Sequence, residues 1–355
     1  MKMKFKKLKI TVGAMALLMS GGLAMAGCPT KGVTELTGAG ATFPYPLYSK
    51  MFSEYQKACN VKVNYQSIGS GGGIRQLQAQ TVDFGGSDGI MDEKQKGEAK
   101  GGPVLHIPTV AGAEAIIFNL PGIQSEKLKI TPEILADIYL KKINNWNDSR
   151  IKALNPGVNL PNLAIAVVHR SDGSGTTFIF TNYLSKVSSE WKDKVGFATS
   201  VNWPGDVGGK GNEGVANSVK QIPGAIGYVE LAYAHQTKIP WAQLRNKAGK
   251  YVAPSLAGAA AAADQKDLPD NMEVVITDSS NPSAYPISGF TWLLVYENQT
   301  DEAKGDAMAN LAWWMIHDGQ KYAEPLEYAP LKGAAIKKSE ALVKKIRANN
   351  RLVLK

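Results

Sequence analysis

One segment of the chain combines residue types that can bind an anion. Residues 170–177, Arg-Ser-Asp-Gly-Ser-Gly-Thr-Thr, follow an apolar run at 163–168 and precede a run that can form a helix. A strand, a tight loop and a helix N-terminus are therefore expected, and the free N–H groups and positive dipole end of such a terminus attract an anion. Arg170 adds a forked cation, and Ser174 and Thr176 add hydroxyl donors. An ordinary helix cap needs the same small polar residues, so this loop alone leaves both interpretations open.

Two other segments repeat this arrangement. Residues 37–44, Thr-Gly-Ala-Gly-Ala-Thr-Phe-Pro, lead into a helix-like run, and the alternating run at 61–65 leads through a Ser/Gly-rich loop at 67–73 into another. Three small-residue loops that each open a helix can converge on one small anion. Such a site would hold its anion mainly by neutral donors and by one arginine. A further Gly-rich connection at 205–214 contains Lys210, which we expect to be a solvated loop residue.

The elements that must position these loops alternate along the chain. Apolar strands are expected at 115–120 and 289–296, and amphipathic helices at 132–140 and 301–317. This alternation predicts an α/β fold with mostly parallel sheets, whose ligands bind at the carboxyl ends of the strands. With 355 residues the chain is long enough for two domains.

The first residues predict an export signal. Lysines at positions 2, 4, 6, 7 and 9 precede an apolar run at 12–19 and the small residues at 24–26, so residues 1–26 are expected to be a signal peptide and not a membrane span. Without these five lysines the formal net charge of +9 falls to +4. Such a mildly basic protein has no strong electrostatic attraction for nucleic acid, and we expect no nucleic-acid partner.

The two cysteines leave two possibilities open. Signal cleavage after Ala26 would leave Cys28 free to pair with Cys59, whereas residues 25–28 also resemble a lipobox with an atypical Met, in which Cys28 would carry a lipid. Cys28 precedes the first expected strand and Cys59 the second, and the starts of neighbouring parallel strands lie close together. A disulfide would also use both thiols in an oxidising compartment, so the disulfide is favoured.

The motifs that would indicate an enzyme are only weakly matched by the sequence. The string Gly-x-Ser-x-Gly at 85–89 resembles a hydrolase nucleophile motif, but no clear helix follows it and no His partner can be assigned. The histidines do not have the spacing of a metal site; they are His106, His169, His235 and His317. We therefore expect no catalytic residue, no metal and no cofactor.

Four segments, in this order along the chain, resemble motifs of the phosphate-binding proteins of bacterial phosphate ABC transporters (PstS type). They lie at 36–44, 64–73, 81–88 and 170–176. Further similarity, such as that at 223–230, extends from about residue 36 nearly to the C-terminus. The departures from the family pattern are an extra glycine, Gly71, and the cysteine pair.

This resemblance implies a type II periplasmic binding protein. Such a protein has two lobes, each a mostly parallel sheet flanked by helices, joined by a two-crossover hinge. By matching, residues 29–110 and 284–355 would form lobe I and residues 111–283 lobe II, with crossovers near 109–110 and 285–286.

The resemblance also implies which residues contact the ligand. Asp172 would brace Arg170. The phosphate contacts would be Thr42, Phe43 (through its N–H), Ser70, Asp88, Arg170, Ser174, Gly175 and Thr176.

The implied function is high-affinity binding of inorganic phosphate outside the cytoplasm and its delivery to the membrane permease of an ABC importer. The protein would act as a monomer in the periplasm, with a soluble form favoured over a lipid anchor at Cys28. The alternatives are a binder of another tetrahedral oxyanion, sulfate or molybdate, and a secreted phosphatase or esterase. Asp88 argues against sulfate, because a carboxylate accepts a proton from phosphate but repels a fully deprotonated oxyanion. The enzyme alternative lacks a nucleophile, a base and a metal set.

Overall fold

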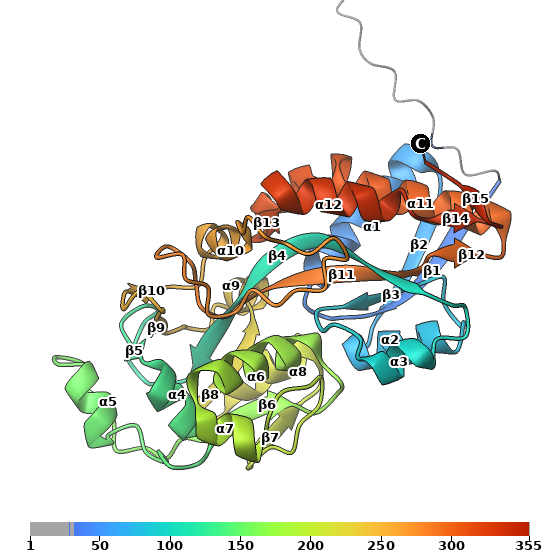
Figure 1. The fold of residues 1–355 in the computed structure, drawn as a ribbon. Helices are drawn as coiled ribbons and strands as arrows, with labels where there is room; N and C mark the ends of the chain where they lie inside the picture. Colours follow the sequence, from blue (N-terminus) through green and yellow to red (C-terminus); the bar gives the residue numbers. More distant parts are fainter. Residues whose placement is uncertain (1–27, 29–31, 355) are drawn as a thin grey trace, which may run out of the picture.

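The structure is a computed structural model that describes residue 28 and residues 32–354. The expected signal peptide, residues 1–26, lies outside the described residues. A nine-stranded sheet runs through the molecule in the order β2-β1-β3-β11-β4-β8-β6-β7, with β13 paired to β4 (Figure 1). Its strands are β1 (Glu35–Gly40), β2 (Lys62–Ser67), β3 (Phe84–Ser87), β4 (Val104–Phe118), β6 (Ala166–Arg170), β7 (Val207–Gly209), β8 (Ala225–Glu230), β11 (Ser288–Tyr296) and β13 (Ala329–Pro330).

Helices flank this sheet. In Figure 1, α11 and α12 lie above β4 and β11, and α2 and α3 lie below β3. The helices are α1 (Tyr45–Cys59), α2 (Ser70–Gln78), α3 (Glu93–Gly97), α4 (Pro132–Tyr139), α5 (Ser149–Leu154), α6 (Gly175–Val187), α7 (Ser189–Lys194), α8 (Gly211–Gln221), α9 (Leu231–Thr237), α10 (Leu256–Ala263), α11 (Glu302–Ile316) and α12 (Gly333–Val343), with 3-10 turns η1 (Asp318–Tyr322) and η2 (Glu324–Leu326). Two small sheets complete the fold, one of β5 (Lys129–Ile130), β9 (Gln243–Arg245) and β10 (Tyr251–Val252), the other of β12 (Asn298–Gln299), β14 (Arg347–Ala348) and β15 (Arg351–Leu352).

The large sheet is parallel at its two ends and antiparallel at its centre. Strand β1 pairs in parallel with β2 and β3, and β6 pairs in parallel with β7 and β8. Its antiparallel pairs all involve β4 or β11. The α/β class predicted from the sequence is confirmed, and the expectation of mostly parallel pairing holds outside these two long strands.

Strand β4 connects the two ends of the sheet. Its residues up to Ala113 pair with β11, and its residues from Glu114 onward pair with β8. At the change of partner, the Glu114 N–H donates to the Ile287 carbonyl oxygen at 2.8 Å. One strand therefore belongs to both halves of the molecule.

Both faces of β4 are buried beyond this point. Ile116 and Phe118 point into the larger core, and Ala115 and Ile117 point into a second core lined by α8 and α9. Successive side chains of a strand alternate between its faces, so a strand covered on both sides reads as a continuous apolar run. This burial explains the apolar sequence at 115–120.

The two cysteines form a disulfide, as the sequence predicts. Cys28 lies before β1, Cys59 ends α1 just before β2, and their Cα atoms are 5.2 Å apart. The parallel pairing of β1 and β2 places the two strand starts side by side, with Glu35 opposite Lys62. The geometry of this strand pair thus brings the two thiols together.

Removing the disulfide should destabilise the protein without unfolding it. The bridge closes a loop with a sequence separation of 31, and a crosslink of this length stabilises by about 2–4 kcal/mol. We expect the Cys28→Ser, Cys59→Ser double variant to lose that amount in the free energy of unfolding, measured by urea denaturation. Reductant should produce the same loss in the wild type and none in the variant. Equal denaturation midpoints for wild type and variant would contradict the prediction.

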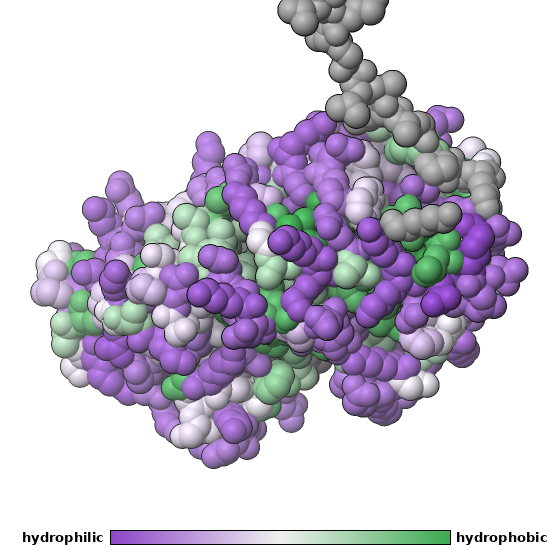
Figure 2. Space-filling model, turned by 45° about the horizontal axis from the view of Figure 1, so that its top comes forward, coloured by the Kyte–Doolittle hydropathy of each residue, from purple (hydrophilic) through white to green (hydrophobic). Residues whose placement is uncertain are grey.

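The surface is largely hydrophilic. Figure 2 shows a face on which hydrophilic residues predominate and apolar residues form small patches. Among the described residues, the large hydrophobic side chains that are exposed are Tyr45, Phe197 and Leu352. None of the described helices combines the length and the apolar character needed to cross a membrane.

Candidate functional site

The N-termini of α2 and α6 meet at the centre of the molecule. The N–H of Gly175, the first residue of α6, donates to Ser70 Oγ, on the first residue of α2, at 3.0 Å. Beside this contact, the Gly71 N–H donates to the Gly173 carbonyl oxygen at 2.9 Å. The first N–H groups of each helix have no partner within the helix and carry the positive end of its dipole. Two positive helix ends therefore converge on one point.

Glycines make this close approach possible. Gly69 precedes α2 with φ at +87°, a conformation that L side chains rarely adopt, and a Cβ there would collide with the Asp172 carboxylate. At Gly175, a Cβ would lie 2.5 Å from both Ser70 Oγ and Asp88 Oδ2. The family departure Gly71 lies in the same contact, where a Cβ would come within 3.1 Å of the Gly173 Cα. The absence of side chains allows the backbones of the two loops to touch.

Arg170 is held in place by Asp172. Its Nε donates to Asp172 Oδ1 at 2.8 Å and its NH2 group donates to Oδ2 at 2.5 Å, while NH1 donates to Thr176 Oγ1 at 3.2 Å. Asp172 Oδ1 also accepts from the Gly211 N–H. Burial alone would lower the pKa of Arg170, but the hydrogen bonds and charge of Asp172 outweigh it and raise that pKa. A buried, permanently charged guanidinium therefore lies beside the start of α6.

Asp88 places one carboxylate in the same cluster. It follows the carboxyl end of β3, is 1% exposed, and its Oδ1 accepts from the Thr291 hydroxyl at 2.7 Å. The turn after β3 is instead held by Ser87, whose Oγ accepts from the Gly89 N–H and donates to the Gly89 carbonyl oxygen. Asp88 is thus not the cap of this turn, and the Ser87 hydroxyl of the hydrolase-like string is occupied by local hydrogen bonds.

Burial changes the protonation of Asp88. Loss of water raises its pKa from the ordinary value of 3.8 to about 7, although Thr291, Arg170 and Ser70 each lower it in part. Near neutral pH this carboxyl can therefore either accept or release a proton.

The raised pKa predicts a pH-dependent stability of the ligand-free protein. A carboxyl whose pKa rises on folding stabilises the native state fully below its unfolded pKa, and this contribution disappears as the pH rises through the folded value. The free energy of unfolding of wild type minus that of Asp88→Asn should therefore fall between pH 4 and pH 7. Urea denaturation of both proteins across this range measures the difference, and a constant difference would contradict the raised pKa.

Thr42 and Phe43 reach the cluster from the loop between β1 and α1. The Thr42 carbonyl oxygen accepts from the Tyr233 hydroxyl at 2.5 Å, and that of Phe43 accepts from the Tyr328 hydroxyl at 2.7 Å. Among the described residues, the Phe43 N–H has no hydrogen-bond acceptor. Gly112 on β4 leaves room for the Phe43 ring, since a Cβ there would lie 2.6 Å from it. The two tyrosines therefore fix this loop while leaving an N–H available.

The structure brings all of the predicted site residues together. The eight expected contacts are buried, and hydrogen bonds or chain adjacency connect them. Ser174 also serves as the ordinary cap of α6, because its Oγ accepts from the Thr177 N–H at 3.0 Å. The cap interpretation of the loop at 170–177 is confirmed, and the same loop lies in the buried cluster. Lys210, by contrast, is exposed.

Asn212 and two glutamates were missed by reasoning from the sequence. Asn212, on the first turn of α8, donates from Nδ2 to the hydroxyl oxygens of Thr42 at 2.7 Å and of Thr176 at 3.2 Å. The Gly-rich connection that opens α8 was a signal for this residue, since it repeats the arrangement of the other three loops.

Glu114 and Glu230 face each other in the pairing of β4 with β8. Both are fully buried, and burial raises the pKa of each carboxyl well above its ordinary value. The nearby charge of Asp88 raises the pKa of Glu114 further. A lone Glu in an otherwise apolar strand sequence was the available signal for Glu114.

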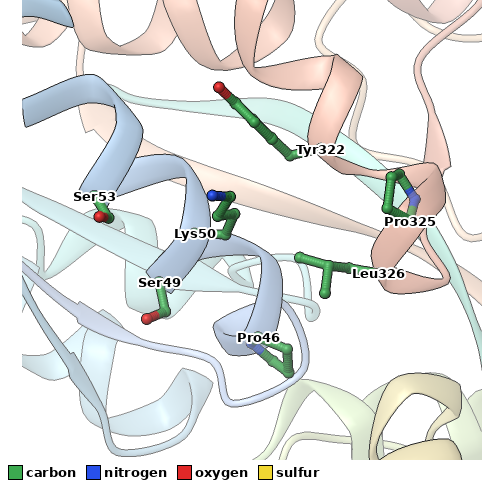
Figure 3. A pocket seen from close by; sticks show the side chains of 7 residues that line it. All are labelled: Pro46, Ser49, Lys50, Ser53, Tyr322, Pro325 and Leu326. Atoms are coloured by element: carbon green, nitrogen blue, oxygen red, sulfur yellow. The ribbon is translucent and has the colours of Figure 1, made fainter. Parts of the chain in front are cut away.

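Figure 3 shows a surface depression that is not part of the buried cluster. It encloses about 450 Å³ between α1 and the turns η1 and η2, and Leu326 points from η2 toward α1. Its one charged side chain, Lys50, pairs with Glu54 at 2.8 Å. None of the predicted phosphate contacts lines this depression. Among the described residues, no group of three or more His, Cys, Asp or Glu side chains is arranged to hold a metal ion.

The chain is similar to a known protein family. Residues 29–318 match the model of a PBP superfamily domain, which defines the class of the protein. The phosphate-binding protein PstS of Xylella fastidiosa (strain 9a5c) is 48% identical over 314 residues, covering 88% of this chain and 85% of the relative. The protein of the same name from Pasteurella multocida is 47% identical over 308 residues, covering 86% and 89%. The chain belongs to this PstS family.

Solved structures show the same fold. A high-affinity periplasmic phosphate-binding protein, solved with bound phosphate, superposes with a TM-score of 0.69 at 21% identity, covering 86% of this chain and 93% of the other. A phosphate-binding protein from Stenotrophomonas maltophilia superposes with a TM-score of 0.64 at 18% identity, covering 87% and 94%. The type II periplasmic binding protein fold predicted from the sequence is confirmed.

Proposed function

We propose that this protein binds inorganic phosphate outside the cytoplasm and delivers it to the membrane permease of an ABC-type phosphate importer. The observation that carries the proposal is the buried cluster in which two helix N-termini, Arg170 and Asp88 meet. The membership of the PstS family supports the same ligand, because relatives at 47–48% identity are named phosphate-binding proteins.

The donors of the site suit a tetrahedral oxyanion. The positive dipole ends of α2 and α6 face the cluster, and the Phe43 N–H and the Arg170 guanidinium supply donors from different directions. The hydroxyls of Thr42, Ser70, Ser174 and Thr176 add further donors. Asp88 is the one acceptor we assign to the ligand, and it would take the hydrogen of a protonated phosphate oxygen.

We further propose that the molecule closes around the ligand as two lobes, residues 29–110 with 284–355 and residues 111–283. The change of partner of β4 at Glu114 and the start of β11 at Ser288 support crossovers near the expected positions. The last part of the second lobe runs back against the first, where Glu273 accepts from Lys96 at 2.7 Å. Hydrogen bonds such as that from Gly175 to Ser70 would then form only when the lobes close.

The location we propose is the periplasm, with the protein soluble and monomeric. The Cys28 sulfur takes part in a disulfide and is therefore not available for a lipid thioether. Intact-mass measurement of the exported protein should show the mass of the chain after signal cleavage minus two hydrogens. A diacylglycerol increment on Cys28 would contradict the soluble form.

Titration calorimetry of phosphate-stripped protein with phosphate, sulfate and molybdate tests the function. We expect one phosphate to bind per chain, with sulfate and molybdate bound far more weakly. Incubation with a chromogenic phosphate ester should give no turnover, because the site lacks a free nucleophile with a base beside it. Preferential binding of another oxyanion, or turnover of the ester, would replace the proposal with one of its two alternatives.

A further inference from the structure

We propose that Asn212 is a positioning residue, which forces the hydroxyls of Thr42 and Thr176 to point their hydrogens at the bound anion. The inference rests on the proposed function, because these hydroxyls belong to the proposed phosphate site. Asn212 is the second residue of α8 and is fully buried. Its effect follows from the hydrogen bonds at its two amide atoms and its backbone N–H.

The backbone determines which way the amide faces. The Glu230 N–H donates to Asn212 Oδ1 at 2.9 Å. A backbone N–H can only donate, so the amide oxygen must face Glu230 and the NH2 group must face the site. The orientation of Asn212 is therefore set by an unambiguous donor and not by the ligand.

The lone pairs of both hydroxyls are then used by N–H donors. Thr42 Oγ1 accepts from Asn212 Nδ2 at 2.7 Å and from the Asn212 backbone N–H at 3.2 Å. Thr176 Oγ1 accepts from Asn212 Nδ2 and from Arg170 NH1, both at 3.2 Å. A hydroxyl has two lone pairs and one hydrogen, so each of these groups has only its hydrogen left to offer.

The direction of these hydroxyl hydrogens determines which ligand oxygens the site can bind. Ser70 Oγ likewise accepts from the N–H groups of Asp88 and Gly175, at 3.2 and 3.0 Å. The three hydroxyls thus present hydrogens, and they suit unprotonated oxygens of the ligand. The protonated oxygen of phosphate is left to face Asp88. Asn212 therefore contributes to selectivity through Thr42 and Thr176 without itself being assigned to the ligand.

Asn212 and Thr176 lie in the same proposed lobe, so the Thr176 hydroxyl is oriented before the ligand arrives and need not be reoriented on binding, which improves affinity. Thr42 precedes α1, whereas Thr176 follows β6 and Asn212 follows β7, so the amide spans the two halves of the molecule. Its bonds with Thr42 join the proposed lobes at the ligand.

A double-mutant cycle on phosphate affinity tests the inference. Asn212→Ala should weaken phosphate binding about tenfold to hundredfold, the loss expected when one partner of buried hydrogen bonds is removed. Thr42→Val removes the hydroxyl and keeps the shape of the side chain. Because Asn212 also donates to Thr176, this background carries Thr176→Val as well. If Asn212 acts through the two hydroxyls, Asn212→Ala should cost no more than about twofold in the Thr42→Val, Thr176→Val background. A residue that merely fills space would give the product of the two separate losses.

Control measurements distinguish the loss of the Asn212 hydrogen bonds from unfolding of the variant and from a wrong assignment of the ligand. Asn217→Ala changes an exposed asparagine of the same helix and should bind phosphate as the wild type does. Urea denaturation reports folding, and Asn212→Ser, too short to span both hydroxyls, replaces Asn212→Ala if the latter does not fold. Unchanged affinity in the Asn212 variant, or additive losses in the cycle, would overturn the inference while leaving the phosphate function intact. Failure of the wild type to bind phosphate would remove both proposals.

Discussion

Replacing Asp88 by Asn should reduce the preference for phosphate over sulfate by at least about 100-fold, which corresponds to about 3 kcal/mol. Asp88 is the one acceptor assigned to the ligand, and it is buried with Oδ1 held by Thr291. In a titration well above the Asp88 pKa of about 7 this carboxyl is ionised, so sulfate, which carries no proton, would place a bare oxygen against a buried carboxylate, and such like-charge contacts cost several kcal/mol. An asparagine amide can donate to a bare oxygen and removes that repulsion.

Competition titration of sulfate against phosphate, at fixed pH and ionic strength, measures this change. Glu213→Gln is the matched control, because it removes the same charge from an exposed residue at the start of α8. That control should keep the wild-type ratio if contact with the anion, and not overall charge, decides selectivity. If Asp88→Asn kept the wild-type ratio of phosphate to sulfate affinity, Asp88 would not be the group that distinguishes a protonated ligand oxygen from an unprotonated one.

Arg170→Ala should give the other large effect, on affinity. Loss of a hydrogen bond to a charged group costs about 1.5–3 kcal/mol. The structure adds a second loss, because Asp172 would keep its negative charge beside the anion once its partner is gone. Calorimetric titration should therefore show phosphate binding weakened by at least that range.

Two further variants divide the effect of Arg170 into its parts. Arg170→Ala combined with Asp172→Asn removes the stranded carboxylate and should recover part of the affinity. Arg170→Lys keeps the positive charge but loses the two-nitrogen guanidinium geometry that pairs with Asp172. Its phosphate affinity should therefore lie between those of Arg170→Ala and the wild type. If Arg170→Ala bound phosphate as tightly as the wild type, the guanidinium would not be part of the site.

The order of the helices and strands could be read from local patterns. The helix at 132–140 and the strand at 289–296 are α4 and β11, within a residue or two at each end. These elements depend on apolar spacing, caps and turns, which are properties of neighbouring residues. The disulfide was predictable for a related reason, since it depends only on two consecutive strands pairing in parallel.

The loops of the site were also visible in the sequence, because small residues before a helix are needed both to cap it and to let an anion approach. The residue types at 170–177 therefore indicated that the loop can bind an anion, although they could not distinguish a helix cap from a binding site. The structure shows Ser174 capping α6 within the buried cluster. Which residues share one cluster followed from the family resemblance and not from spacing.

Only the tertiary structure decided which distant side chains complete the site. Asn212 meets Thr42 across 170 positions of sequence, and Thr291 meets Asp88 across 203. The Gly-rich stretch before α8 marks the segment that contains Asn212 but not the distant residue it meets, and Thr291 lies in an apolar strand that belongs to no motif. Their positions follow from the order of strands in the sheet and from β4, which pairs with β11 in one half of the sheet and with β8 in the other. Periodicity and capping act over a few residues, while strand order is set by packing of the whole chain. The sequence therefore indicated the loops of the proposed site, and only the fold determined which distant side chains orient their hydroxyls.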